Sequence, residues 1–263
     1  MTDPTPWTPA DAARWIAVPG PDDDKYSRGV LGIVTGSDQY PGAAVLGVEA
    51  ALRTGVGMVR YLGPRRATDL VLHRRPEAVA SDGRVQAWLL GSGMDPVDRD
   101  TTLMERALDQ GLPVVLDGGA LDLRARARGP VVLTPHYREL ARVLGADASE
   151  IASDPAGWAS RASVELDATV LLKGHSTYVA GPGVLLRVSA APAWLATAGA
   201  GDALGGILGA LVATHAADPD LPALAATAAL VHGLAAERAS AGGPLTILDL
   251  CASIPAVIAE LIS

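Results

Sequence analysis

A run of small residues that ends in an aspartate, Ala196–Asp202, is the segment of this sequence best suited to chemistry. Gly199, Ala200 and Gly201 lead directly into an apolar stretch with helical character. Backbone N–H groups at such a helix start converge on one point, where the helix dipole favours an anion. Asp202 follows in the first turn. The segment predicts an anion hole beside a carboxylate base, which suits phosphoryl transfer to a hydroxyl.

A structural interpretation of the same segment stays open. An aspartate that merely caps a helix after a glycine-rich loop gives the same pattern. The sequence contains no Walker phosphate-binding loop, so the segment is not a nucleotide site of that type. If Asp202 is a base, we expect the helix N-terminus to keep it ionised at neutral pH.

Polar or glycine-rich residues also follow most of the short apolar runs. They are Gly36-Ser37, Gly91–Gly93, Asp117, His136 and Lys173-Gly174. In open α/β sheets, ligands bind beyond the carboxyl ends of the strands, so we expect these residues to border one site. Structural alternatives stay open here too: Asp117 and His136 as helix caps, Lys173 as a solvated strand end, and Tyr40 as an aromatic at the core edge.

The elements that must position these residues alternate between strand and helix. The apolar runs predict strands at Val30–Thr35, Met58–Leu62, Trp88–Leu90, Pro113–Leu116, Val131–Leu133 and Thr169–Leu172, and a hairpin of Thr177–Ala180 with Val184–Val188. Helices are predicted at 43–53, 98–110, 137–144, 155–166, 202–216, 221–239 and 246–262. Continuous apolar strands separated by helices predict a mostly parallel sheet covered on both faces. We expect one domain over residues 1–263, with 1–25 as an N-terminal extension.

Composition excludes several partners. A net charge of −8 with only 4% aromatic residues argues against nucleic acid and anionic membranes as ligands. The longest apolar tract, Ala203–Ala213, is too short to span a bilayer, and the N-terminus does not resemble a secretory signal. The single cysteine, Cys251, lies in an apolar stretch, which favours a buried, inert thiol and a cytoplasmic location.

Seven motifs in order resemble the NAD(P)H-hydrate dehydratase family of the ribokinase-like superfamily. They are Lys25–Gly29, Gly36–Ala44 with Ala50–Gly57, Gly91–Met94, Leu116–Leu121, Leu133–His136 with Glu139, Lys173–Thr177, and Ala196–Asp202. The resemblance covers residues 25–262. It implies a ribokinase-like three-layer α/β/α fold and a stand-alone dehydratase domain, without the epimerase domain that some members carry upstream.

The resemblance also implies a reaction. Members of this family remove water from the C6 hydrates of NADH and NADPH (NADHX and NADPHX), using ADP or ATP as phosphate donor and Mg²⁺. By the resemblance, Ala43, Gly93, His136 and Asp202 would contact the hydrate. Lys173, Gly174, His175, Ser176, Thr177 and Gly201 would hold the adenine nucleotide. It further implies a homo-oligomer, commonly a tetramer; no metal-ligating residue follows from it.

Four departures from the family pattern stand in the sequence. Gly119 occupies the place of a second acid, Tyr137-Arg138 replaces Pro-Gly after His136, Asp95 replaces a glycine after Met94, and Tyr26 replaces a glycine in the first motif. Two alternatives therefore remain: a ribokinase-like kinase that phosphorylates a small hydroxyl compound, and a degenerate nucleotide-binding protein without turnover.

Overall fold

A nine-stranded sheet forms the centre of the protein in the computed structural model, which describes residues 3–263. The strands are β1 (Thr5–Pro6), β2 (Val30–Val34), β3 (Met58–Tyr61), β4 (Ala87–Leu90), β5 (Val114–Leu116), β6 (Val131–Leu133), β7 (Thr169–Leu172), β8 (Thr177–Gly181) and β9 (Val184–Val188). Their order is β1-β9-β8-β7-β6-β5-β4-β2-β3. All pairings are parallel except those of β8 with β7 and β9, so the predicted parallel sheet and hairpin are confirmed.

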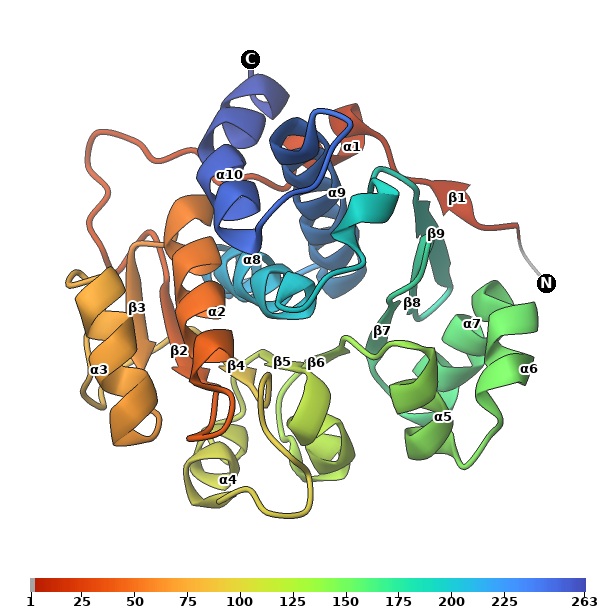
Figure 1. Cartoon of the computed structure of the whole chain (residues 1–263), viewed down its shortest axis with the longest axis horizontal. Helices are drawn as coiled ribbons and strands as arrows, with labels where there is room; N and C mark the ends of the chain where they lie inside the picture. Colours follow the sequence, from red (N-terminus) through yellow and green to blue (C-terminus); the bar gives the residue numbers. More distant parts are fainter. Residues whose placement is uncertain (1–2) are drawn as a thin grey trace.

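Helices cover both faces of this sheet (Figure 1). One face carries α2 (Pro41–Thr54), α3 (Arg65–Arg74), α8 (Ala200–Thr214), α9 (Leu221–Ser240) and α10 (Ile247–Leu261). The other carries α4 (Thr102–Leu108), α5 (Tyr137–Leu144), α6 (Ala148–Ser153), α7 (Pro155–Glu165) and the 3₁₀ helix η1 (Gly118–Arg126). A second 3₁₀ helix, η2 (Ala193–Leu195), precedes α8.

Alternation along the strands divides the core into two layers. In β4, Leu89 packs with the α8–α9 layer, whereas Trp88 and Leu90 pack with the α4–α5 layer. Successive strand side chains point to opposite faces, so fully apolar strands are required when both faces are covered. Every residue of β2, β4, β5, β6 and β7 is buried.

The N-terminal segment adds to this fold. Strand β1 pairs in parallel with β9 at the sheet edge, and α1 (Pro9–Ala13) packs against α9 and α10. Between them, Trp7 Nε1 donates a hydrogen bond of 3.3 Å to Thr227 Oγ1 on α9. Met1 and Thr2, the first residues of the expected 1–25 extension, lie outside the described part of the chain.

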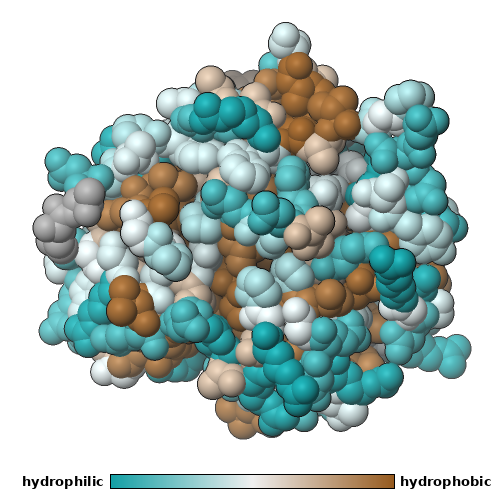
Figure 2. Space-filling view, turned by 180° about the vertical axis from the view of Figure 1, so that it is seen from behind, coloured by the Kyte–Doolittle hydropathy of each residue, from teal (hydrophilic) through white to brown (hydrophobic). Residues whose placement is uncertain are grey.

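The surface combines hydrophilic residues with separate hydrophobic patches, as the rear view in Figure 2 shows. None of the helices found in residues 3–263 has both the length and the apolar character needed to cross a membrane. Cys251 is fully buried in α10, and burial raises the pKa of its thiol to about 12, as expected of an inert cysteine.

Candidate functional site

The glycine-rich loop starts α8 as predicted, but Asp202 does not cap it. Gly199 is the N-cap residue and has φ +91°, a left-handed conformation that glycine adopts without strain. Helix α8 begins at Ala200, which makes Asp202 its third residue. No side chain caps this helix start, and the Asp202 carboxylate has no hydrogen bond among residues 3–263. The interpretation of Asp202 as a simple helix cap is therefore wrong.

The protonation state expected for Asp202 needs correction. Burial, reinforced by the negative charge of Asp117, raises its pKa to about 7, although Lys173 acts in the opposite direction. The helix N-terminus does not outweigh this loss of hydration, so Asp202 is only partly ionised at neutral pH. A pKa near the working pH is nevertheless well matched to a general base.

An ion pair between a buried carboxylate and a partly buried lysine lies beside this loop. Lys173 Nζ, at the end of β7, is 2.8 Å from Asp117 Oδ1 at the end of β5. Ser92 Oγ and Thr134 Oγ1 also donate to the Asp117 carboxylate, at 2.9 and 2.8 Å. Asp117 is thus a buried anchor and makes no capping hydrogen bond to η1, and Lys173 is not a solvated strand end.

Each partner of this pair holds the other in its charged form. Burial acts to raise the pKa of Asp117, but Lys173 and the two hydroxyl donors keep it below its usual value. Burial acts to lower the pKa of Lys173, but Asp117 and Glu139 raise it above its usual value. A Cβ at Gly201 would lie 3.5 Å from Lys173 Nζ, so the ammonium group borders the loop that begins α8.

His136 follows β6 and Lys173 follows β7. The two residues form a parallel β-bridge, so they lie side by side. His136 is also the N-cap of α5: its Nδ1 accepts hydrogen bonds from the backbone N–H groups of Arg138 and Glu139, both at 3.1 Å. The capping interpretation of His136 is therefore correct. Capping uses Nδ1 as an acceptor, and Nε2 lies 3.6 Å from Glu139 Oε1. About half of the side chain is exposed.

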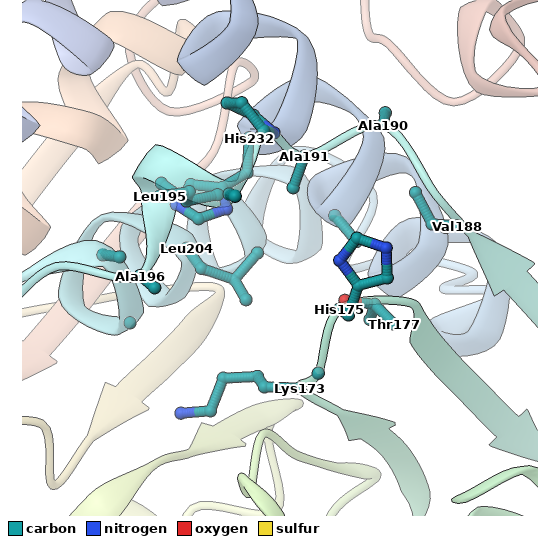
Figure 3. A pocket seen from close by; sticks show the side chains of 16 residues that line it. Lys173, His175, Thr177, Val188, Ala190, Ala191, Leu195, Ala196, Leu204 and His232 are labelled. Atoms are coloured by element: carbon teal, nitrogen blue, oxygen red, sulfur yellow. The ribbon is translucent and has the colours of Figure 1, made fainter. Parts of the chain in front are cut away.

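A first cavity of about 450 Å³ opens next to Lys173 (Figure 3). Residues predicted to hold the nucleotide or the anion line it: Lys173, Gly174, His175, Thr177, Ala200 and Gly201. Apolar residues from Val188 to Leu204 form much of the remaining wall, together with His232. Two predicted residues lie outside this lining. Ser176 Oγ instead contacts Ser189 Oγ at 3.1 Å, and Gly199 packs toward Leu46.

Two of the residues predicted to contact the hydrate, Ala43 and Gly93, meet near the carboxyl ends of β2 and β4, whereas His136 follows β6 and Asp202 lies in α8. A Cβ on Gly93 would lie 2.3 Å from the Cβ of Ala43, which shows that only glycine fits this contact. The segment from Gly36 to Tyr40 and the neighbouring Met94 line a second cavity of about 520 Å³, although Ala43, Gly93 and His136 do not. Tyr40 is 54% exposed at this cavity, so it is not a core-edge aromatic.

One departure from the family pattern, Gly119, lies against the residue that precedes another, Asp95. Gly119 packs against the backbone of Met94, and a Cβ there would lie 2.5 Å from the Met94 carbonyl oxygen. The loop that continues into Asp95 therefore occupies the space that an acidic side chain at position 119 would need. A third departure, Tyr137, places its hydroxyl against Gly174, where a Cβ would come within 2.3 Å.

The donor groups near the loop do not form a complete metal site. No cluster of three or more His, Cys, Asp or Glu side chains that could hold a metal ion occurs in residues 3–263. Asp117 already has three donor partners, whereas the Asp202 carboxylate is available. Mg²⁺ usually binds through one or two carboxylates together with substrate phosphates and water. The site therefore fits an ion that arrives with a nucleotide.

Sequence comparison decides the family. The sequence model of the NAD(P)H-hydrate dehydratase family matches residues 31–253. The chain belongs to the NAD(P)H-hydrate dehydratase family. This family assignment confirms the resemblance seen in the seven motifs.

Two relatives illustrate how much of each protein is shared. A bifunctional NAD(P)H-hydrate repair enzyme of Mycobacterium tuberculosis is 45% identical over 216 residues, which cover 77% of this chain and 44% of that protein. An ADP-dependent (S)-NAD(P)H-hydrate dehydratase of Xanthomonas campestris is 35% identical over 240 residues, or 81% and 82% of the two chains. The chain thus spans less than half the length of the bifunctional relative.

Solved structures agree with this family of dehydratases. The ADP/ATP-dependent NAD(P)H-hydrate dehydratase of Bacillus subtilis, co-crystallised with ATP and Mg²⁺, superposes with a TM-score of 0.89 at 25% identity, covering 99% of this chain and 100% of that one. A ribokinase-like superfamily protein of Enterococcus faecalis has a TM-score of 0.86 at 21% identity, covering 98% and 96%. The expected ribokinase-like α/β/α fold is confirmed.

Proposed function

We propose that this protein restores damaged NADH and NADPH by removing water from their C6 hydrates, with ADP or ATP as the phosphate donor. The observation that carries the proposal is the Asp202 carboxylate in the first turn of α8, which interacts electrostatically with Lys173 and Asp117 and directly follows Gly201 in the wall of the first cavity. Family membership and the names of the relatives support the same reaction.

The reaction divides into a phosphoryl transfer and an elimination. Asp202 accepts the proton of the C6 hydroxyl, whose oxygen attacks the terminal phosphoryl group of the nucleotide. With ADP, AMP leaves. The lone pair on the ring nitrogen then expels phosphate from C6, and loss of a proton from C5 restores the ring double bond. The sum is hydrate plus ADP giving reduced cofactor, AMP and phosphate, so the removed water ends in the phosphate.

The chain supplies positioning and charge for these steps. The backbone N–H of Ala200 donates to the Thr197 carbonyl at 3.3 Å, so the backbone N–H of Gly201 stabilises the negative charge that develops on the transferred phosphoryl group. Lys173 contributes a positive charge, and Asp117 fixes the position of its ammonium group. Mg²⁺, when it is bound with the nucleotide, neutralises phosphate charge. By the resemblance, Lys173–Thr177 would hold the nucleotide, and all of them except Ser176 line the first cavity. Ala43, Gly93, His136 and Asp202 would contact the hydrate.

The absorbance of reduced cofactor at 340 nm gives a direct test. Hydrated NADH is incubated with the protein and Mg²⁺ and with ADP, ATP or no nucleotide. We expect absorbance to recover only with a nucleotide, together with release of AMP (or ADP from ATP) and phosphate. A stable phosphorylated product without recovery would identify a small-molecule hydroxyl kinase instead. Nucleotide-dependent thermal stabilisation without turnover would identify a degenerate binding protein.

Two further expectations accompany this function. We expect a homo-oligomer, with a tetramer as the first hypothesis, and light scattering coupled to size-exclusion chromatography tests it. We also expect a cytoplasmic location, which the single buried thiol of Cys251 supports, since a reducing compartment leaves such a thiol free. Subcellular fractionation tests that expectation.

A further inference from the structure

A buried histidine in the wall of the first cavity has no part in the chemistry described above. His232 lies in α9, is 6% exposed, and lines the cavity together with Ala229 one turn earlier. In Figure 3 it lies across the cavity from Lys173. Sequence analysis did not select His232, because it stands in the middle of an apolar helix with no neighbouring polar motif.

The imidazole of His232 has one nitrogen whose hydrogen-bonding capacity is not used by the described part of the chain. Its Nε2 is enclosed and unpartnered among residues 3–263. The backbone of Ala200 contacts the ring but satisfies at most one of its two nitrogens. Burial, reinforced by the charge of Lys173 and opposed by the Ala200 contact, lowers the pKa of His232 to about 4. The ring is therefore neutral near pH 7, with one donor and one acceptor. Buried polar groups normally have a partner, so a bound ligand is expected to supply it.

The place of His232 along the cavity indicates which part of a nucleotide it meets. Lys173 and Gly201 form a charged end suited to phosphates, whereas Val188, Ala190 and Ala191 form an apolar part suited to a base. A Cβ at Gly233 would lie 2.9 Å from the Ala190 backbone, so α9 packs directly against the apolar part at the residue after His232. The ring itself contacts Ala200 at the charged end. His232 thus lies between the two, where the ribose of a nucleotide lies between phosphate and base.

We infer that His232 is a nucleotide-binding residue whose imidazole hydrogen-bonds to a ribose hydroxyl. The inference rests on the proposed function and deepens it. A hydroxyl both donates and accepts, so it suits either tautomer of a neutral imidazole. A phosphate oxygen, by contrast, only accepts hydrogen bonds. Lys173 and the backbone N–H groups of the loop are better donors for it.

Calorimetry with deoxynucleotides tests the contact. ADP, 2′-deoxy-ADP and 3′-deoxy-ADP are titrated into the wild-type protein and into His232→Phe, which keeps an aromatic ring but cannot form the hydrogen bond. The matched control is His215→Phe, because His215 lies after α8, contacts Trp15 and does not line the cavity. We expect one deoxy analogue to bind the wild type about three- to tenfold more weakly than ADP, the range for one hydrogen bond.

The variant pattern decides the outcome. His232→Phe should bind ADP three- to tenfold more weakly and should no longer distinguish it from that analogue, while His215→Phe should behave as the wild type. Equal binding of all three nucleotides by the wild type, or full discrimination by His232→Phe, overturns the inference but leaves the proposed function standing. Absence of any nucleotide binding by the folded wild type removes both.

A measurement on the unsubstituted protein guards against a variant that does not fold. The ring ¹⁵N resonances of His232 should shift on addition of ADP, and shift less with the analogue that lacks the bonded hydroxyl. Identical shifts with ADP and with both deoxy analogues contradict the inference.

Discussion

The environment of Asp202 disfavours its charged form. The pKa of Asp202 is therefore raised into the range that suits its proposed role as a general base. An aspartate in water has a pKa near 3.8, whereas burial and the nearby Asp117 bring that of Asp202 to about 7. The folded state therefore binds a proton more tightly than the unfolded state, and stability is lost as the pH rises from about 4 through 7. The ionised Asp202 carboxylate therefore lowers the stability of the folded protein at neutral pH.

Asp202→Asn should therefore stabilise the protein while reducing its activity. Above pH 7 the gain should approach about 4 kcal/mol, and at pH 5 it should be less than half as large. Turnover should fall by about 10²–10⁴, the usual contribution of a positioned base. Urea unfolding at pH 5 and 8, with turnover measured in parallel, checks both. Asp69→Asn, at an exposed carboxylate, should change neither. Unaltered turnover in Asp202→Asn would remove it from the reaction.

The pair of Lys173 and Asp117 should show strong energetic coupling. Lys173→Met leaves Asp117 buried without its cation, which should cost about 3–5 kcal/mol of stability. Adding Asp117→Asn removes the stranded charge and keeps an acceptor oxygen for one of the two hydroxyls, while its amide N–H can donate to the other, so the double variant should recover much of that loss. Unfolding by urea of the wild type, both single variants and the double variant measures the coupling. Additive effects would show that the 2.8 Å contact contributes little to stability.

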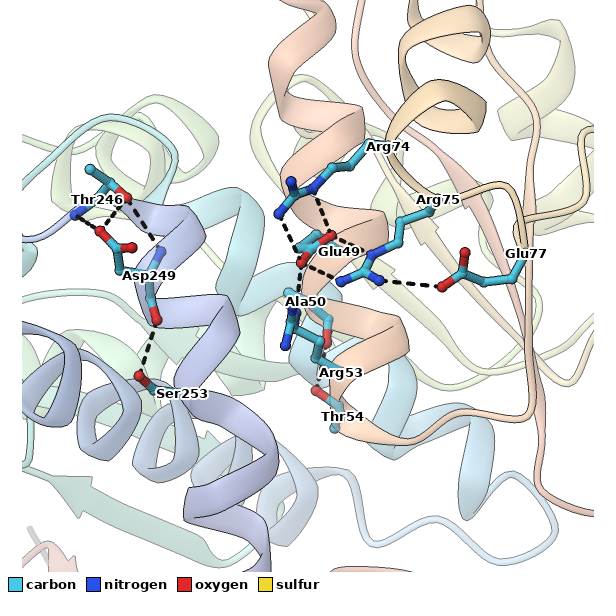
Figure 4. A network of polar contacts seen from close by, with 10 residues as sticks. All are labelled: Glu49, Ala50, Arg53, Thr54, Arg74, Arg75, Glu77, Thr246, Asp249 and Ser253. Carbon is cyan, nitrogen blue, oxygen red and sulfur yellow. Dashed lines mark hydrogen bonds and ion pairs between the residues drawn. The ribbon is translucent and has the colours of Figure 1, made fainter.

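Helix α3 is held to α2 by a buried carboxylate and three arginines (Figure 4). Glu49, fully buried on α2, contacts Arg53 on the same helix and both Arg74 and Arg75 at the end of α3. Burial acts to raise the pKa of Glu49, but the three guanidinium groups lower it to about 2. The cluster therefore orients α3 on the surface of α2, where few apolar side chains of α3 are buried.

Glu49→Gln should destabilise the protein by about 3–5 kcal/mol, because three arginines lose their shared counter-charge. The control is Glu77→Gln, at a half-exposed carboxylate that pairs with Arg75 at 3.4 Å and should cost less than about 1 kcal/mol. The lowered pKa gives stability that is complete above pH 4.5 and is lost as the pH falls toward 2, on the order of 3 kcal/mol. Chemical unfolding between pH 6 and 3 should show a steeper loss for the wild type than for Glu49→Gln. Parallel curves would contradict this account.

The two ends of the chain are joined through the α8–α9 layer of the core. Trp7 follows β1 and reaches Thr227 on α9, 220 residues later, while α1 packs against α9 and α10. Trp7→Ala should lower stability by about 2 kcal/mol, less than for a fully buried tryptophan because its side chain is partly exposed. Thermal unfolding measures the loss. Trp194→Ala, at a half-exposed tryptophan in η2, should change stability by less than about 0.5 kcal/mol. Equal losses in both variants would mean that the Trp7 contact is not a specific anchor.

Local sequence signals predicted most of the elements, and their failures have local causes. Strands β2 to β9 and the helices after Gly201 agree with the structure to within a few residues, because buried parallel strands are continuous apolar runs, whereas the edge strand β1 was not predicted. The helix predicted at 98–110 begins later, at Thr102, because the side chains of Asp95 and Asp100 accept backbone N–H groups and hold the chain in turns. Helix α3 was not predicted, since it buries only Ala67 and Val71.

The sequence alone predicted several residues that line the first cavity, among them Lys173, Thr177 and Gly201, because the ends of parallel strands and a glycine-rich helix start are local features. Only the tertiary structure decided their charge states and partners. The pKa of Asp202 depends on burial by the assembled core, and Lys173 meets Asp117 across 56 positions of the chain. His232 lies in an apolar helix whose sequence carries no sign of a ligand. That one of its nitrogens has no partner is evident only in the folded protein, where α9 forms part of the cavity wall. Burial and hydrogen bonding depend on neighbours that are distant in sequence.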